Sequence, residues 1–244
     1  MTAIVELERL AVRALPAVES TTLDGWHLPF GRGQVRRMNA VTTFGIVSWD
    51  TFEAVETIER RYGSRRRPVI FRLTALDAEL DDLLFARGYE KSDEVAVMTA
   101  PATGRPDDAV SWTGAVTPGW LDTLQRLGEY TEARVAELGE SLSGMTLPHA
   151  AFRAGVGATA TSSAVGLAVL DSGWVGLFDI AVDPERRRRG LGTTITSAML
   201  SWGAERGATS AYLQVLADNA PGVNLYAGMG FSESHRYWYR TLDR

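Results

Sequence analysis

The sequence predicts a mixed α+β fold, because short apolar segments with strand character alternate with amphipathic helical segments along the chain. Two such sets follow one another, and a segment rich in Pro, Gly and Asp, residues 100–109, separates them. The 244 residues are enough for one large or two small domains. We therefore expect two domains, residues 1–104 and 105–244.

The first set opens with an amphipathic helix over residues 2–15. Asp24-Gly25 is a strong signal for a two-residue hairpin turn, so the flanking residues of 21–30 are expected to form paired strands. The other elements expected in this set are strand 35–43, helix 51–61, strand 69–74, helix 76–87 and strand 95–99.

The second set is expected to contain three antiparallel strands followed by two helix-strand pairs. Residues 174–182 form a short apolar run between turn signals, as expected of a strand buried on both faces. The expected elements are strand 111–116, a helix from 118, a helix and loop over 132–149, strands 155–161, 164–170 and 174–182, a helix from 191, strand 209–216, helix 222–228 and strand 236–241.

Residues 183–193, between a strand and a helix, read Asp-Pro-Glu-Arg-Arg-Arg-Arg-Gly-Leu-Gly-Thr. The first N–H groups of a helix have no intrahelical partner, and the helix dipole adds about half a positive charge there. Gly190 and Gly192 lack a Cβ, so an anion can approach the backbone closely, and the arginines attract it. This segment predicts a phosphate-binding site.

Two common phosphate-binding motifs do not fit this segment. A dinucleotide fingerprint needs a third glycine, where this chain has Ile195, and no Gly-Lys-Ser/Thr follows as in a Walker loop. The pattern Arg187-x-x-Gly190-x-Gly192 instead resembles the pyrophosphate-binding motif of the GNAT (Gcn5-related N-acetyltransferase) superfamily. A second motif similar to that family's follows at the expected distance, with Asn219, Leu225-Tyr226 and Gly230-Phe231.

The resemblance covers roughly residues 160–240 and implies a GNAT fold, a central, mostly antiparallel sheet flanked by helices. It also implies an N-acetyltransferase that moves an acetyl group from acetyl-CoA directly to an amine. In this family the strand ending at residues 180–182 separates from the next strand at a bulge and pairs with the pantetheine arm. The residues implied to contact acetyl-CoA are Ile180, Ala181, Val182, Arg187, Arg188, Arg189, Gly190, Leu191, Gly192, Thr193 and Asn219.

Tyr226 is the candidate general acid, because its position matches the family motif. A phenol with a pKa of about 10 is protonated at neutral pH and can protonate a leaving thiolate, whose pKa is about 8.5. Asn219 is expected either to contact the pantetheine or to cap the helix that follows it.

The general base has no clear candidate in the sequence. The related ribosomal-protein alanine acetyltransferases have a glutamate where this chain has Gln214, which cannot accept a proton at neutral pH. Asp179, acting through a water, is the nearest acidic alternative. Glu129, Glu132 and Glu137 lie where an acceptor-binding helix is expected, but charged residues there are expected to be solvated. His149 and His235 are candidates on chemistry alone.

The two halves are related by a constant offset of 142 residues, which pairs Gly88-Tyr89 with Gly230-Phe231. This predicts a tandem arrangement of two GNAT-like folds. At the same offset Tyr226 corresponds to Leu84, and Asn219 to Asp77. We therefore expect a degenerate N-terminal half that has lost the cofactor site and helps to form the acceptor pocket.

Composition narrows the possible partners. A net charge of −5 argues against broad nucleic-acid binding, even with the run Arg186 to Arg189. The chain has no cysteine and only three histidines, so neither a thiolate metal site nor an acyl-cysteine intermediate is expected. We expect acetyl-CoA, CoA and an unidentified amine as ligands, no metal and no membrane partner, a cytoplasmic location, and a monomer or homodimer. The alternative to an enzyme is a non-catalytic acyl-CoA-binding module or sensor.

Overall fold

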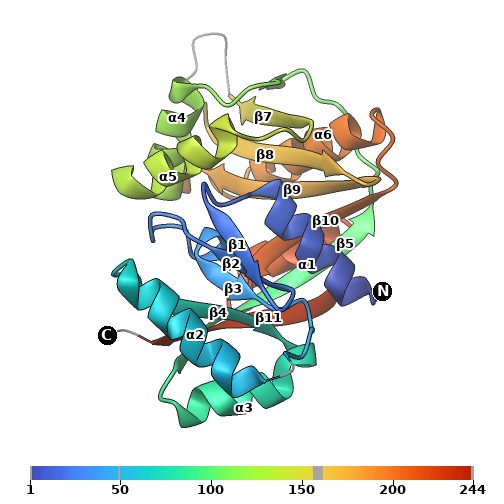
Figure 1. The fold of residues 1–244 in the computed structure, drawn as a ribbon. Coiled ribbons are helices and arrows are strands. Elements are labelled where there is room, and N and C mark those ends of the chain that lie inside the picture. Colours follow the sequence, from blue (N-terminus) through green and yellow to red (C-terminus); the bar gives the residue numbers. More distant parts are fainter. Residues whose placement is uncertain (1, 49, 156–161, 243–244) are drawn as a thin grey trace. The chain divides into compact units, whose positions relative to one another are not determined.

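The structure, a computed structural model, describes residues 2–48, 50–155 and 162–242. It confirms a mixed α/β fold with a mostly antiparallel sheet (Figure 1). The chain divides into two compact units. The first contains Met1–Val97, Leu216–Asp218 and Ser234–Arg244, and the second contains Met98–Val215 and Asn219–Glu233. The division into domains at residue 104 stays a prediction.

The first unit has a sheet in the order β1-β2-β3-β4-β11, with β5 beside β11. The central strand β4 pairs in parallel with β3 and antiparallel with β11. The elements of this unit are α1 (Ala3–Ala14), β1 (Ser20–Leu23), β2 (Trp26–Pro29), η1 (Arg36–Met38), β3 (Ala40–Thr42), α2 (Thr51–Ser64), β4 (Val69–Thr74), η2 (Ala75–Asp77), α3 (Ala78–Ala86), most of β5 (Glu90–Pro101) and most of β11 (Ser232–Leu242).

The predicted hairpin is confirmed in this unit. Asp24 and Gly25 connect β1 and β2 with φ angles of 50° and 86°, the left-handed pair that a type I′ turn requires. The predicted helix over residues 2–15 is confirmed as α1, whose N-cap Thr2 accepts a hydrogen bond from the Val5 N–H.

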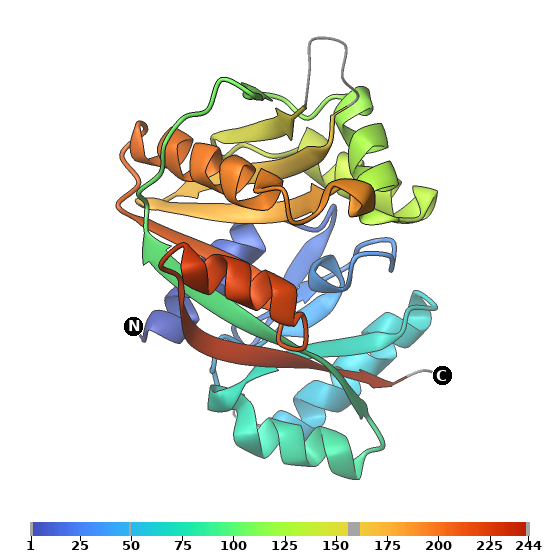
Figure 2. The same ribbon diagram turned by 180° about the vertical axis from the view of Figure 1, so that it is seen from behind.

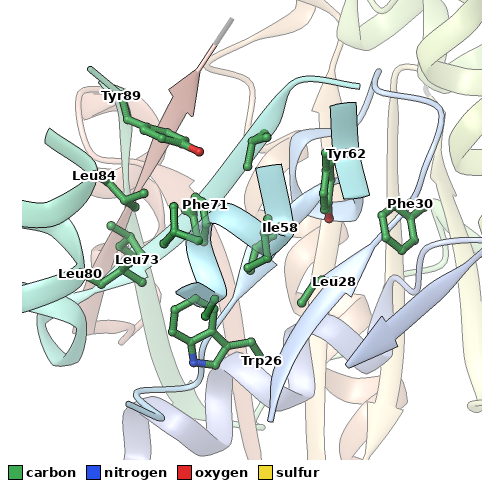
Figure 3. Packing of buried hydrophobic residues seen from close by; sticks show 14 residues of the cluster. Trp26, Leu28, Phe30, Ile58, Tyr62, Phe71, Leu73, Leu80, Leu84 and Tyr89 are labelled. Atoms are coloured by element: carbon green, nitrogen blue, oxygen red, sulfur yellow. The ribbon is translucent and has the colours of Figure 1, made fainter. Parts of the chain in front are cut away.

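A cluster of buried apolar side chains forms the core of the first unit (Figure 3). Phe71 on β4 lies at its centre, with edge-to-face contacts to Trp26 at 6.3 Å and Tyr89 at 5.7 Å between ring centroids. The polar atoms of two large rings are satisfied, since Trp26 Nε1 donates to the Ile46 carbonyl at 2.7 Å and the Tyr62 hydroxyl donates to the Pro29 carbonyl at 2.6 Å. Full burial of one large apolar side chain stabilises the folded state by about 1.5–3 kcal/mol.

The second unit has the strand order β10-β9-β8-β7-β6, in which only β10 and β9 pair in parallel among the registers of the described residues. Helix α6 covers one face of this sheet, and α4 and α5 cover the other (Figures 1 and 2). The elements of this unit are β6 (Val110–Thr113), α4 (Pro118–Gly128), α5 (Glu132–Ser143), β7 (His149–Ala154), β8 (Ala164–Asp171), β9 (Trp174–Val182), η3 (Pro184–Arg186), α6 (Leu191–Ala204), most of β10 (Ser210–Leu216) and α7 (Ala220–Gly228).

Two predicted strands differ from the structure, and a third lies outside the described residues. The strand expected over 35–43 is interrupted by the turn η1, in which the Met38 and Asn39 N–H groups bond to carbonyls three residues back, so only Ala40–Thr42 pairs as β3. The strand expected over 95–99 extends to twelve residues as β5. The strand expected over 155–161 falls on residues 156–161, which lie outside the described residues, and β7, over His149–Ala154, was not predicted as a strand.

No helix among the described residues is both long and apolar enough to cross a membrane.

Candidate active site

The segment after β9 forms a tight, arginine-rich turn into α6. The Asp183 carboxylate accepts the Glu185 N–H at 3.0 Å and begins η3, and the Asp183 carbonyl accepts the Arg186 N–H at 2.9 Å. Arg188 and Gly190 then both adopt left-handed backbone conformations, with φ of 59° and 81°. The turn exposes Arg187, Arg188 and Arg189 to solvent.

The N-terminus of α6 is open. Its N-cap residue is Gly190, which has no side chain to cap the helix. The first intrahelical bond runs from the Thr194 N–H to the Gly190 carbonyl at 2.9 Å, so the N–H groups of residues 191–193 precede the helical ladder. These N–H groups and the helix dipole are the features on which the predicted anion-binding site depends.

The two glycines of the motif have different structural roles. A Cβ at Gly190 would meet nothing within 4 Å, so this glycine is required by its φ of 81°. A Cβ at Gly192 would lie 2.8 Å from Leu225 Cδ1, so this glycine allows α6 to pack closely against α7. Gly192 therefore links the arginine-rich turn to the helix that carries Tyr226.

A β-bulge interrupts β9 just before this turn. Val165 on β8 pairs with Ala181, but Leu167 pairs with Phe178, so Asp179 and Ile180 together face a single residue of β8. Asp179 has a φ of 48°, a left-handed conformation that a bulge tolerates. The residue opposite the bulge is Gly166, and a glycine inside a strand is a sequence signal from which this bulge could have been predicted.

Strands β9 and β10 separate at the bulge. Their parallel pairs run from Trp174 with Ser210 to Leu177 with Leu213, and no later pair joins them among the described residues. Residues 178–182 of β9 and 214–216 of β10 thus extend past the last pair. This is the divergence that the GNAT resemblance implied, and it places the backbone of residues 180–182 at the strand end nearest the turn.

Asn219 caps α7, as one of the two predicted roles requires. Its side-chain oxygen accepts the Gly222 N–H at 3.1 Å. A Cβ at Gly222 would lie 2.8 Å from the Asn219 amide nitrogen, so the cap depends on both residues. Contact of Asn219 with a pantetheine stays a prediction.

Tyr226 lies on α7 with its ring edge-to-face against Phe231, 5.9 Å between centroids. The side chain is half-buried, and burial raises the pKa of Tyr226 to about 12. No described residue forms a hydrogen bond with its hydroxyl, so this group is available to a substrate. These features are those of a phenol that stays protonated at neutral pH.

The candidate bases fall in different environments. Asp179 is half-buried at the bulge, and Gln214 is half-buried on β10. Glu129 and Glu132 are exposed, as expected, but Glu137 on α5 is 1% exposed, so the expectation that it is solvated is wrong. The reason is its place on the face of α5 that also buries Leu138.

Each of the two histidine candidates already has a ring nitrogen in contact with another group of the fold. A ring nitrogen of His149 lies 2.9 Å from the Leu147 carbonyl, and His235 belongs to the first unit, where Nε2 is bonded to the Glu8 carboxylate at 3.0 Å. Neither of these contacts involves Tyr226. Among the described residues no group of three or more His, Cys, Asp or Glu side chains could hold a metal ion.

Comparison with known proteins identifies the family. Residues 2–240 match the family model described as "Probable histone acetyltransferase Rv0428c C-terminal". The chain belongs to this acetyltransferase family. It is 32% identical over 242 residues to "Probable histone acetyltransferase Rv0428c" of Mycobacterium tuberculosis, a match that covers 97% of this chain and 73% of that protein. It is 29% identical over 243 residues to "Uncharacterized N-acetyltransferase YobR" of Bacillus subtilis, covering 96% and 97%.

Solved structures show the same fold. The "GCN5-related N-acetyltransferase from Kribbella flavida" has a TM-score of 0.71 at 14% identity, and the match covers 99% of this chain and 96% of that one. A "Tandem GNAT protein from the clavulanic acid biosynthesis pathway" has a TM-score of 0.67 at 13% identity, covering 97% and 87%. The protein is thus an acyltransferase of the GNAT superfamily, whose acetyltransferases use acetyl-CoA as donor.

Proposed function

We propose that this GNAT protein transfers the acetyl group of acetyl-CoA directly to an amine. The observation that carries the proposal is the uncapped N-terminus of α6 beside the point where β9 and β10 separate. The first feature suits the diphosphate of CoA, and the second suits its amide-containing pantetheine arm. Both features lie within the second unit.

The diphosphate would accept hydrogen bonds from the backbone N–H groups of residues 188–193, with Arg187, Arg188 and Arg189 adding charge. Hydrogen bonds to a charged group are worth about 1.5–3 kcal/mol each. The backbone of Ile180, Ala181 and Val182 would pair with the pantetheine amides as a neighbouring strand does. The N–H of Ala181 or Val182 is the proposed donor to the thioester oxygen.

The reaction requires a neutral amine, whose nitrogen attacks the thioester carbon. As the C–N bond forms and the C–S bond breaks, the nitrogen loses one proton and the sulfur gains one. We assign the second proton to the Tyr226 hydroxyl, which then recovers a proton from solvent.

The raised pKa of Tyr226 constrains this assignment. A phenol of pKa about 12 is a weaker acid than a thiol of pKa about 8.5, so transfer to a fully solvated thiolate would be uphill by about 5 kcal/mol. The same burial that raises the phenol pKa also destabilises a thiolate beside it, which reduces this difference. Tyr226 therefore acts first as a hydrogen-bond donor to the departing sulfur, and proton transfer accompanies cleavage of the bond.

Asp179 is the proposed base, acting through a water. Asp179 lies in the bulge of β9 with a left-handed backbone conformation, and its side chain is half-buried. It directly precedes residues 180–182, where β9 has separated from β10. Gln214 cannot take this role, and the proton of the amine is therefore proposed to leave by Asp179.

The acceptor is proposed to be an amine that is cationic in solution and gives one proton to the solvent before it attacks. One relative is named a probable histone acetyltransferase, and histones are lysine-rich proteins. A chain with a net charge of −5 attracts such acceptors over a distance of about a Debye length, 10 Å at 0.1 M salt. We retain the cytoplasm as the proposed location, which fractionation of cells expressing the protein would test.

A thiol-release assay tests the proposal. Purified protein is incubated with acetyl-CoA and a panel of polyamines, lysine-rich peptides and peptides with free N-termini, and free CoA is measured against a protein-free control. Release that requires an acceptor and falls in the variant Tyr226→Phe supports the enzyme. Tight binding of acetyl-CoA with no release for any acceptor would favour the alternative, a non-catalytic acyl-CoA sensor.

A further inference from the structure

The connection from α2 to β4 in the first unit carries an unusual density of arginine. Five of the eight residues 60–67 are arginine, in a chain whose net charge is −5. Arg60 and Arg61 lie in the last turns of α2, Arg65 is its C-cap, and Arg66 and Arg67 follow before β4. None of these residues belongs to the proposed acetyl-CoA site, which lies in the second unit.

Four of these arginines have no carboxylate partner among the described residues. Arg65 pairs with Glu19 at 3.1 Å, but Arg60 bonds only to the Thr57 hydroxyl and Arg67 only to the Arg32 carbonyl, at 2.6 Å. Within the described part of the chain, the side chains of Arg61 and Arg66 have no hydrogen bond or ion pair. Other arginines of the same unit do have carboxylate partners, namely Arg36, Arg72, Arg87, Arg236 and Arg240.

The carboxylate that lines the same region is already engaged. Both oxygens of Glu59 accept hydrogen bonds from Arg87, at 3.3 and 3.0 Å, and one also accepts the Tyr89 hydroxyl at 3.1 Å. Attraction to the C-terminal dipole of α2 explains Arg60 and Arg61, which are within the helix. It does not require Arg66 and Arg67, which lie beyond its end.

A cavity of about 460 Å³ opens beside these two side chains. Arg66 and Arg67 supply its cationic part, and Pro68, Val69 and Leu242 supply an apolar wall. Val69 and Leu242 are paired across β4 and β11, so this wall is part of the sheet (Figure 1). The volume is within the range of small-molecule sites, about 300–1,000 Å³.

The backbone of Arg66 is strained. Its φ of 53° is left-handed, which for a non-glycine residue costs about 1–3 kcal/mol. Glycine would adopt this conformation without strain, so the folded state would be more stable with glycine here. An arginine that weakens the fold is expected where its side chain has another use.

We propose that this cavity binds a small organic anion, whose carboxylate or phosphate group pairs with Arg66 and Arg67 and whose apolar part packs on Pro68, Val69 and Leu242. Guanidinium groups bind both anions in the same two-point geometry, so the chemistry is shared between the two sources. The apolar wall distinguishes such a ligand from inorganic phosphate.

The test measures binding of phenyl phosphate, benzoate and inorganic phosphate to the 244-residue protein by calorimetry, with saturation-transfer NMR as a second measurement for the two aromatic anions. We expect at least tenfold tighter binding of phenyl phosphate or benzoate than of inorganic phosphate. The double variant Arg66→Gln, Arg67→Gln should weaken that binding at least tenfold. Arg134→Gln on α5, which removes one positive charge elsewhere, should leave it unchanged.

Two further variants distinguish this cavity from the N-terminus of α6. Arg188→Glu disables the proposed diphosphate site, so binding that is lost in this variant and kept in the double variant would place the anion at α6 and overturn the proposal. Arg66→Gly should raise the melting temperature while weakening binding, because it removes both the strain and the charge. Equal binding by wild type and the double variant, or no binding of either aromatic anion at about 10 mM, would also overturn it.

Discussion

The substitution Tyr226→Phe removes one hydroxyl and leaves the rest of the site in place. The ring keeps its contact with Phe231, and no described residue loses a hydrogen bond, because none bonds to this hydroxyl. We therefore expect the free energy of unfolding to change by less than about 0.5 kcal/mol. The loss should appear in the chemical step instead.

General acid catalysis contributes about 10²–10⁴-fold to a rate, equal to about 3–5 kcal/mol of transition-state stabilisation. The raised pKa of Tyr226 makes full proton transfer unfavourable, so we expect the lower part of this range, a loss of kcat of about 10²-fold. The dissociation constant of acetyl-CoA should stay within about twofold, since the proposed diphosphate contacts lie on α6. The assay is steady-state thiol release together with calorimetry of acetyl-CoA.

The pH profile provides an independent test. With a folded pKa of about 12, less than about 1% of Tyr226 is ionised at pH 9.5, so kcat should show no decline from this group up to that pH. Because this pKa lies above the unfolded value near 10, wild type should lose stability relative to Tyr226→Phe only above pH 10, by up to about 2.7 kcal/mol near pH 12. A variant with kcat within about threefold of wild type would refute the acid role and leave Tyr226 as a packing residue.

Three other predictions concern packing, electrostatics and topology. Gly192→Ala places a Cβ 2.8 Å from Leu225 Cδ1, so it should weaken acetyl-CoA binding about tenfold. The control Gly228→Ala places a Cβ with no atom within 4 Å, so it should not weaken binding. Calorimetry of acetyl-CoA against both variants measures the difference. Burial raises the pKa of Glu8, but the Arg72 charge and the His235 hydrogen bond together lower it by more. Arg72→Met removes that charge, so urea unfolding at pH 7 should show a free energy of unfolding that is lower by about 3–5 kcal/mol. Without the Arg72 charge, burial raises the pKa of Glu8 in the folded variant, so that carboxyl becomes protonated as the pH falls and the loss should shrink; a constant difference would contradict the assignment. A fragment of residues 1–104 lacks β11, which pairs with six residues of β4, so circular dichroism should show it to be unfolded. The same fragment joined through a flexible linker to residues 232–242 should recover structure. A folded 1–104 fragment would contradict this prediction.

Local signals predicted the turns and caps of the candidate site better than the sheet. The open helix start at Gly190, the cap at Asn219 and the hairpin at Asp24-Gly25 each depend on a few neighbouring residues, and the structure has all three. The strand at 149–154 was missed because its alanines are not typical of strands, and pairing with β8 decides its structure.

Contacts between residues far apart in the chain have no local signal in the sequence. Glu8, Arg72 and His235 form a buried ion-pair cluster from positions up to 227 residues apart, and no spacing predicts it. The burial of Glu137 likewise follows from how α5 packs. The contact of Arg236 with Glu94 at 3.1 Å is another that no local pattern indicates.

The N-terminus of α6 is proposed to bind the diphosphate of acetyl-CoA. This is tested by calorimetry of acetyl-CoA and CoA against wild type, Arg188→Glu and the matched control Arg134→Glu. We expect one site per chain in wild type and in the control, and a loss of about 10–100-fold in Arg188→Glu, the value of one charge-assisted hydrogen bond. No binding by wild type, or equal binding by all three proteins, would contradict the claim.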